Sequence, residues 1–169
     1  MTTTAHLHPP RRLLPSDDRS GFHSGVDELE EWLHRYALQN QRADNAVTYV
    51  AALEDRIIGY YALCAASISR DHTPAGFGRG RPGYVPCVLL ARLAVDTRAT
   101  GRGLGAALFR DAVARAISAS KTIGAACLLI HARDDEARAF YLHNADLHES
   151  PVDPLHLILP MKIARGLAG

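Results

Sequence analysis

The stretch CVLLARLAVDTRATGRGLGAALFRDAV, residues 87–113, decides how this chain folds. Its first nine residues, 87–95, are almost all apolar, which predicts a buried strand. Gly101 and Gly103 follow with arginines beside them, and Leu104 opens a run with the apolar spacing of a helix. The stretch therefore predicts a strand, a glycine turn and a helix in immediate succession.

A turn of this kind is typical of an anion site. The first backbone N–H groups of a helix have no partner within the helix, and the helix dipole favours negative charge there. Glycines allow a ligand close to the backbone and tolerate positive φ. Arg98 and Arg102 add positive charge beside the turn. We expect a phosphate-bearing ligand here, and the plain alternative is a tight helix start with no ligand.

The same glycines also satisfy the dinucleotide fingerprint G-x-G-x-x-G/A, through Gly101, Gly103 and Ala106. Two features count against that interpretation. The motif follows a predicted antiparallel hairpin, beyond the middle of the chain. The next acidic residue after a strand, Asp134, falls further along than the roughly 20 residues typical of the fingerprint.

The rest of the chain predicts helices and strands in mixed order. Periodicity and turn residues predict a helix over 26–36, hairpin strands over 46–53 and 56–69, a Gly/Pro-rich loop over 70–86, a helix over 104–120, a strand over 124–132, a helix over 132–144 and a last strand over 155–164. This order predicts an α/β protein of the mixed α+β kind, with a central mixed β-sheet flanked by helices.

Length and composition narrow the class of protein. A chain of 169 residues predicts a single domain over 1–169, with residues 1–15 as its candidate flexible end. Neither a signal peptide nor a membrane span is recognisable, which predicts a cytoplasmic protein. The net charge of +1 excludes a uniformly basic nucleic-acid coat, although 17 of the 19 basic residues are Arg, which suits phosphate contacts. No His or Cys spacing predicts a metal site.

The run Arg98-x-x-Gly101-x-Gly103 resembles the (Q/R)-x-x-G-x-(G/A) signature of GNAT acyltransferases, and the order of elements resembles that family too. The resemblance implies an acetyl-CoA-dependent N-acetyltransferase with the GNAT fold. It assigns the cofactor's pantetheine to the backbone of the strand and its diphosphate to the turn. The cofactor-binding residues so implied are Leu93, Ala94, Val95, Arg98, Gly101, Arg102, Gly103, Leu104 and Gly105.

Acyl transfer from a thioester also needs a proton for the departing thiolate. The pair Phe140-Tyr141 resembles the stretch in which GNAT enzymes place their general acid, which implies that Tyr141 is catalytic. A Tyr pKa of about 10 suits donation of a proton at neutral pH. His131 and His143 are nearest in sequence as candidate bases, and a water chain is the alternative.

Longer segments resemble the TacT-like GNAT toxins of type II toxin–antitoxin systems, most distinctively LARLAVD at 90–96 and SPVDPLHL at 150–157. The resemblance implies acetylation of the α-amine of the amino acid on charged tRNA, a block in translation, a ribbon-helix-helix antitoxin and a homodimer. It implies tRNA contacts for Arg79, Arg81 and Arg92, and for Arg11 and Arg12 at the N-terminus.

One departure from the GNAT pattern F-Y-x-x-x-G-F is Ala145-Asp146 after the last helix, which puts the shape of the acceptor pocket in doubt. Two other functions stay open. The same fold acetylates small-molecule or protein amines in other enzymes, and a domain that binds CoA or a partner without turnover would be a regulator.

Overall fold

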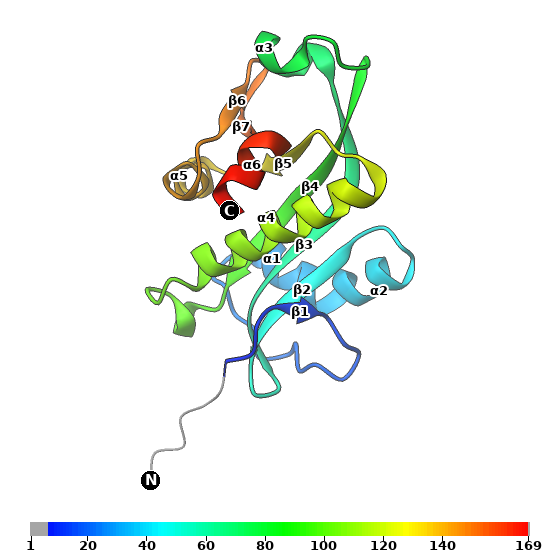
Figure 1. Cartoon of the computed structure of the whole chain (residues 1–169). Helices are drawn as coiled ribbons and strands as arrows, with labels where there is room; N and C mark the ends of the chain where they lie inside the picture. Colours follow the sequence, from blue (N-terminus) through cyan, green and yellow to red (C-terminus); the bar gives the residue numbers. More distant parts are fainter. Residues whose placement is uncertain (1–6, 169) are drawn as a thin grey trace. The chain divides into compact units, whose positions relative to one another are not determined.

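The computed structural model describes residues 7–168 (Figure 1). The predicted flexible end falls partly on residues 1–6, outside this range; within it, Leu13 is buried. In chain order the elements are β1 (Arg11–Arg12), α1 (Asp27–Glu31), the π-helical η1 (Trp32–Tyr36), α2 (Ala37–Arg42), β2 (Val47–Leu53), β3 (Arg56–Ser69), η2 (Arg70–His72), α3 (Ala75–Gly78), β4 (Tyr84–Val95), η3 (Thr97–Ala99), α4 (Leu104–Ile123), β5 (Cys127–His131), α5 (Asp135–Asn144), β6 (His148–Ser150), β7 (Asp153–Pro160) and α6 (Met161–Ala168).

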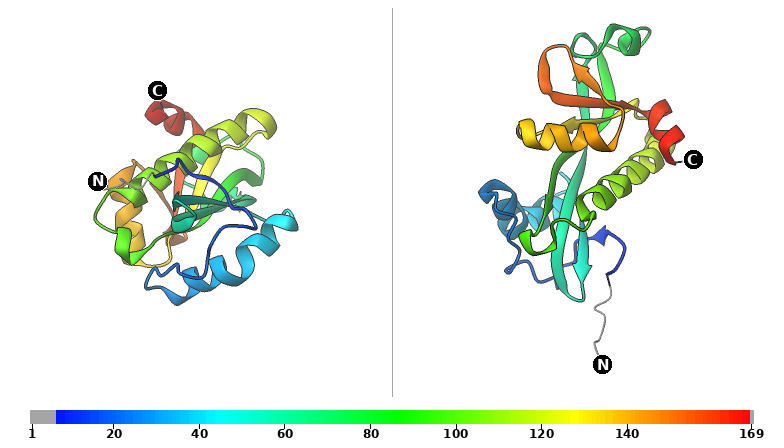
Figure 2. Two further views of the ribbon diagram at one scale, coloured as in Figure 1. Left: turned by 90° about the horizontal axis from the view of Figure 1, so that it is seen from below. Right: turned by 90° about the vertical axis from the view of Figure 1, so that its left-hand side faces the viewer.

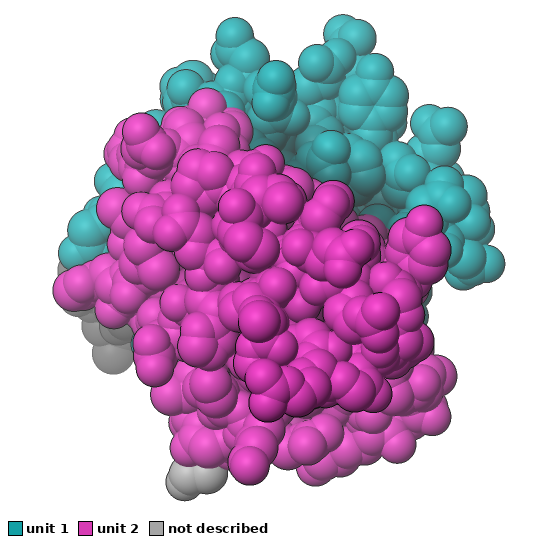
Figure 3. All heavy atoms as spheres, turned by 90° about the horizontal axis from the view of Figure 1, so that it is seen from above, with its two compact units in different colours: residues 1–63, 92–111 teal, residues 64–91, 112–169 magenta. Residues whose placement is uncertain are grey.

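The strands of this part form a seven-stranded sheet in the order β1-β2-β3-β4-β5-β7-β6. The hairpin β2–β3 is antiparallel, β4 and β5 are parallel, and β7 pairs antiparallel with both β5 and β6. This confirms the predicted mixed sheet with flanking helices. The chain divides into two compact units, residues 1–63 with 92–111 and residues 64–91 with 112–169 (Figure 3).

In the first unit, helices cover both faces of the sheet (Figure 2). The run α1–η1–α2 packs Leu33 and Leu38 against Val50 of β2 and Tyr60 of β3. The start of α4 lies on the other side, over Gly59 of β3. The Tyr60 hydroxyl donates to the Leu29 carbonyl at 2.5 Å, so even the large buried tyrosine has its polar atom satisfied.

The second unit holds its own apolar cluster. Ile68 of β3 and Val85 of β4 pack with Leu129 of β5 and Ile158 of β7. β4 pairs with β5 over Cys87–Leu90 and Cys127–Ile130. Phe77 of the short helix α3 packs against the same cluster, and the Ser150 hydroxyl donates to the His72 carbonyl at 2.6 Å, so the predicted loop 70–86 is anchored within the second unit.

The sequence-based prediction lacked several short elements. The helix predicted over 26–36 continues through α2, and the predicted loop over 70–86 contains η2 and α3. β1 and β6 are two and three residues long, too short for an alternating pattern to register. The predicted last strand ends at Pro160, and Met161 starts the helix α6 instead. Proline removes a donor from the ladder, which suits it to a strand end.

Gly59 tests the contact between β3 and α4. A Cβ at this position would lie 2.9 Å from Leu108 Cδ1 and 3.2 Å from Leu104 Cδ2. We expect Gly59→Ala to lower the free energy of unfolding by about 1–3 kcal/mol, because the added methyl overpacks the interface. Urea titration measures the difference. Gly83→Ala, which adds a methyl with no described heavy atom within 4 Å, is the control, and equal losses in both variants would contradict the close packing.

Candidate active site

The glycine turn has the geometry that the sequence predicts. β4 ends at Val95, one turn of 3-10 helix follows, and α4 begins at Leu104. Gly101 and Gly103 have φ of 79° and 75°, the left-handed region that favours glycine. The Ala107 N–H donates to the Gly103 carbonyl at 3.0 Å, so the hydrogen-bond ladder of α4 starts there. The backbone N–H groups before Ala107 have no partner within the helix and point out of its N-terminal end, where an anion can accept hydrogen bonds from them.

Asp96, directly after β4, stabilises this turn through hydrogen bonds. Its side chain is buried and accepts hydrogen bonds from the backbone N–H of His23 at 3.1 Å and of Arg98 at 2.9 Å. Its own N–H donates to the Ile58 carbonyl at 2.8 Å. The hydrogen bonds from Arg98 hold the pKa of Asp96 far below its usual value, so the carboxylate stays ionised.

The Arg98 guanidinium forms a bidentate interaction with this carboxylate. Its Nε lies 2.9 Å from Oδ1 and its Nη2 lies 2.8 Å from Oδ2 of Asp96, and Nη2 also donates to the Gly21 carbonyl. The side chain and the N–H of Arg98 therefore hold the turn in shape. Sequence reasoning missed Asp96, although an acid directly after an apolar strand was a usable signal.

A hollow of about 440 Å³ lies beside the turn within the first unit. Arg102 and Gly103 of the turn line it together with Arg56 and Ile58 of β3. Arg102 is exposed, so its charge is available to a ligand. Of the strand residues predicted to hold a cofactor, Ala94 is buried, whereas Leu93 and Val95 are half-buried on β4.

Tyr141 lies in the second unit, on α5. The Asp134 side chain caps this helix by accepting from the Ala137 N–H at 2.9 Å. The Tyr141 side chain is buried, with the Phe140 ring edge-on at 5.2 Å between centroids. Burial raises the pKa of its hydroxyl well above the usual value, so it is a proton donor and not a base at neutral pH.

The two candidate bases differ in surroundings. His131, at the end of β5, stacks on His156 of β7 with 4.0 Å between ring centroids. Burial and then the nearby His156 lower the pKa of His131, so its imidazole is neutral at pH 7 and able to accept a proton. His143 is exposed in the last turn of α5.

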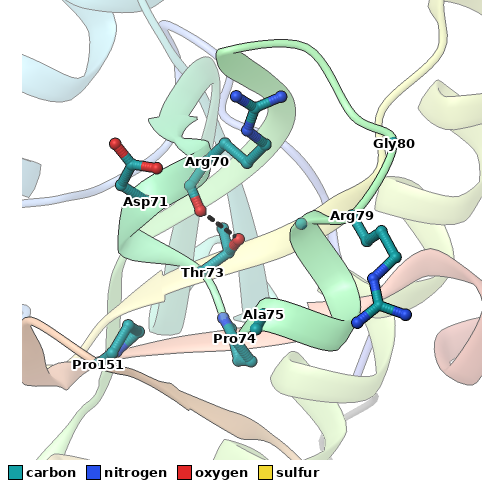
Figure 4. Close-up of a pocket in the computed structure, with 9 residues that line it drawn as sticks. Arg70, Asp71, Thr73, Pro74, Ala75, Arg79, Gly80 and Pro151 are labelled. Carbon is teal, nitrogen blue, oxygen red and sulfur yellow. Dashed lines mark hydrogen bonds between the residues drawn. The ribbon is translucent and has the colours of Figure 1, made fainter.

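The arginines predicted to contact RNA lie in different settings. The Arg81 guanidinium covers the Phe77 ring at 4.2 Å, and that of Arg92 covers the Trp32 ring at 3.9 Å. Arg79 is exposed and lines a hollow of about 660 Å³ on the η2–α3 loop. In Figure 4 the guanidinium groups of Arg70 and Arg79 point in different directions.

At the N-terminus, Arg11 forks onto Asp17 at 2.7 and 2.8 Å, while Arg12 is exposed. Within residues 7–168 no group of three or more His, Cys, Asp or Glu residues is placed to hold a metal ion. In the same range, no helix is both long and apolar enough to cross a membrane.

The structure thus combines a mixed sheet with a strand that leads through a glycine turn into a helix. The Acetyltransferase (GNAT) family matches residues 12–145, and the chain belongs to that family. The predicted resemblance to GNAT enzymes is thereby confirmed, and the expected acetyltransferase class with it.

Relatives extend over nearly the whole chain. A tRNA-acetylating toxin of Mycobacterium tuberculosis (strain ATCC 25618 / H37Rv) is 44% identical over 160 residues, which cover 95% of this chain and 96% of the relative. The structure of AtaT complexed with acetyl-methionyl-tRNAfMet has a TM-score of 0.88 at 25% identity and covers 97% of this chain and 100% of AtaT. A Tyr-to-Phe mutant of AtaT bound to the C-terminus of the antitoxin AtaR and to acetyl-CoA has a TM-score of 0.82 at 25% identity, covering 96% and 97%.

Asp96→Asn tests the support beneath the turn. We expect it to lower the free energy of unfolding by about 2 kcal/mol or more, because a neutral amide cannot replace the ionised acceptor of the Arg98 fork. Since the folded-state pKa of Asp96 is depressed, its stabilisation is present above pH about 4 and is lost as pH falls. Urea titrations at pH 7 and at about pH 3, below the unfolded-state pKa, measure this, and the gap between variant and wild type should narrow at the lower pH.

Asp146→Asn is the matched control, since it removes the same charge from an exposed position. It should stay within about 0.5 kcal/mol of wild type at both pH values. A loss in the Asp96 variant no larger than in this control would contradict the role assigned to the buried carboxylate.

Proposed function

We propose that this chain is an acetyltransferase toxin that moves the acetyl group of acetyl-CoA to the α-amine of the amino acid on charged tRNA and so blocks translation. The observation that carries the proposal is the 44% identity, over 95% of the chain, to a tRNA-acetylating toxin. The glycine turn and the buried tyrosine on α5 support the proposal, because such a reaction needs an anion site and a proton donor.

The glycine turn fits the diphosphate of acetyl-CoA. A Cβ built on Gly101 or Gly103 would meet no described heavy atom within 4 Å, so the space above both residues is open to a ligand. The N–H groups of Gly101, Gly103, Leu104 and Gly105 would hold the diphosphate, with the Arg102 guanidinium beside them. Arg98 serves the same site by holding the turn on Asp96.

The β4 backbone at Leu93, Ala94 and Val95 would pair with the pantetheine arm. β4 continues to Val95, whereas its pairing with β5 stops at Leu90 and Ile130, so these residues lie beyond the last position that pairs with β5. When bound, acetyl-CoA supplies a reactive thioester. A backbone N–H near Val95 would stabilise the negative charge that develops on the thioester oxygen.

Tyr141 would donate its proton to the departing thiolate. Its raised pKa keeps the hydroxyl protonated until a base forms beside it. The acceptor amine must be unprotonated to attack. An α-amine has a pKa of about 7.7–8.0 and a lysine amine about 10.4, so an α-amine needs a weaker base. His131, neutral at pH 7, or a water chain would take the proton of the amine.

We further propose the partners that such a toxin requires. AtaT, a structural relative, is solved with the C-terminus of its antitoxin, which supports an antitoxin for this chain. We assign it the ribbon-helix-helix class, and we propose a homodimer in the cytoplasm with both compact units in one catalytic domain. The proposed tRNA contacts are Arg79, Arg81 and Arg92. The Arg81 guanidinium is held against the Phe77 ring, and the Arg92 guanidinium against the Trp32 ring.

Transfer of labelled acetyl from acetyl-CoA to total charged tRNA tests the function. We expect acid-precipitable label on charged tRNA and none on deacylated tRNA, because the acceptor is the amino acid. Free amino acids, peptides and small amines serve as competing acceptors. Label on those amines with charged tRNA inert would replace the toxin by an acetyltransferase for small molecules or proteins.

Tyr141→Phe tests the general acid. We expect kcat to fall by about 10²-fold or more while the affinity for acetyl-CoA changes little, because only proton donation is lost. Steady-state kinetics and calorimetry measure the two quantities. Tyr84→Phe removes the same hydroxyl from an exposed ring and should keep wild-type turnover. Equal turnover in both variants would remove Tyr141 from the mechanism.

A further inference from the structure

A basic hollow lies on the outer side of the first helical run, within the first unit. Its volume is about 470 Å³. The residues that line it are Arg19, His34, Arg35, Leu38, Gln39, Arg42 and Ala43. Four of these seven are basic and none is acidic, and none of the four belongs to the glycine turn or to the tRNA contacts proposed above.

The helical run has two distinct faces. Leu33, Ala37 and Leu38 are buried in the core, whereas His34 and Arg42 are exposed on the outer side. The apolar side chains at helical spacing therefore pack against the sheet, and the basic side chains on the opposite face remain in solvent.

A π-turn interrupts the run at the level of the hollow. The Ala37 N–H donates to the Trp32 carbonyl, five residues back. This π-turn carries His34 and Arg35 of the hollow. Single π-turns within α-helices are rare and are frequent at functional sites. The basic side chains thus gather at an uncommon backbone feature.

Neighbouring acidic side chains neutralise little of the positive charge of the arginines that line the hollow. Arg35 Nη1 lies 3.7 Å from Glu31 Oε1, but both side chains are at least half exposed, so the pair is weak. Arg19 lies close enough to Asp17 to help lower the pKa of the Asp17 carboxyl, but that carboxylate already accepts two hydrogen bonds from the Arg11 guanidinium. Among the described residues, no ion pair is recorded for Arg19 or Arg42. Asp17 and Asp18 line a neighbouring hollow together with Arg19 and His34, but neither acid lines the basic hollow itself. The lining of the basic hollow is therefore positively charged.

We propose that this basic hollow binds backbone phosphates of the RNA substrate. The inference rests on the proposed function, because it needs a polyanionic acceptor. Guanidinium groups donate two parallel hydrogen bonds to a phosphate, and several of them around one concave surface suit consecutive phosphates. Phosphate contacts position a nucleic acid without reading its sequence.

The lining favours RNA over an acidic peptide. Protein partners anchor through apolar or aromatic side chains in desolvated pockets. The apolar lining of the hollow consists of Ala43 and Leu38, and Leu38 is only 8% exposed. The hollow on the η2–α3 loop is a weaker candidate, because Arg70 there donates to the Arg81 carbonyl and its guanidinium diverges from that of Arg79 (Figure 4).

The double variant Arg19→Ala with Arg42→Ala tests the hollow. Fluorescence anisotropy with labelled deacylated tRNA measures binding without any chemistry. We expect the Kd to rise roughly tenfold and the slope of log K against log salt to become shallower by about 2, one for each lost phosphate contact. The KM for charged tRNA should rise in parallel, with kcat and the affinity for acetyl-CoA unchanged.

The matched control removes Arg110 and Lys121, which are exposed on α4, and so changes the net charge by the same amount. An equal loss of tRNA affinity in the control would overturn the proposal, because the effect would then be unspecific. Unchanged tRNA binding in the Arg19/Arg42 variant would also overturn it, while acetyl transfer to charged tRNA by the wild type would leave the proposed function standing.

A wild-type protein that neither binds nor acetylates tRNA would defeat the proposed function and this inference together. A variant that keeps its tRNA affinity but loses affinity for an acidic peptide from the antitoxin would assign the hollow to the protein partner instead. An intact Kd for acetyl-CoA in each variant shows that the fold has survived.

Discussion

The buried carboxylate of Asp96 is the constraint on which the glycine turn depends. Asp96 joins three segments. Its carboxylate accepts hydrogen bonds from the backbone N–H groups of His23 in the N-terminal loop and of Arg98, and its backbone N–H donates to the Ile58 carbonyl of β3. A buried charge is tolerable only when hydrogen bonds and an opposite charge surround it, and the Arg98 fork provides both. Gly101 and Gly103 then complete a turn whose N–H groups face outward.

Two groups of four arginines lie in different surroundings, which composition cannot reveal. Arg11, Arg81, Arg92 and Arg98 are engaged by an acid or an aromatic ring within the protein. Arg19, Arg42, Arg79 and Arg102 instead line hollows. The first group is held in place by other side chains of the protein, and Arg81 and Arg92 of this group are also proposed as tRNA contacts. Among the described residues, the second group has no such partner and is proposed to meet a cofactor phosphate or an RNA backbone. A net charge of +1 conceals this division.

The sequence predicted most of the frame because its signals are local. The apolar run before Asp96, the glycines and the helical spacing after Leu104 each act over a few residues, and the structure confirms the strand, the turn and the helix start. The hairpin β2–β3 follows from β-branched and aromatic residues in the same way. The helix over 26–36 was found too, but periodicity alone gives no sign that a π-turn interrupts it.

The interactions that sequence reasoning missed are long-range. The Asp96 contacts with His23, the stacking of Arg92 on Trp32 and the pairing of His131 with His156 join residues far apart in the chain. Short elements such as β1 and β6 exist because a neighbouring strand offers a ladder, and their own residues carry no pattern. The roles proposed for Tyr141 and for the cofactor residues came from the family resemblance and not from local spacing.

The most direct test of the central claim is mass spectrometry of the aminoacyl-adenosines released by ribonuclease from tRNA treated with the enzyme and acetyl-CoA. We expect a mass increase of one acetyl group, with fragment ions that place it on the α-amine. Acetyl on a side-chain amine or on the ribose, or unmodified aminoacyl-adenosine despite bound acetyl-CoA, would contradict it.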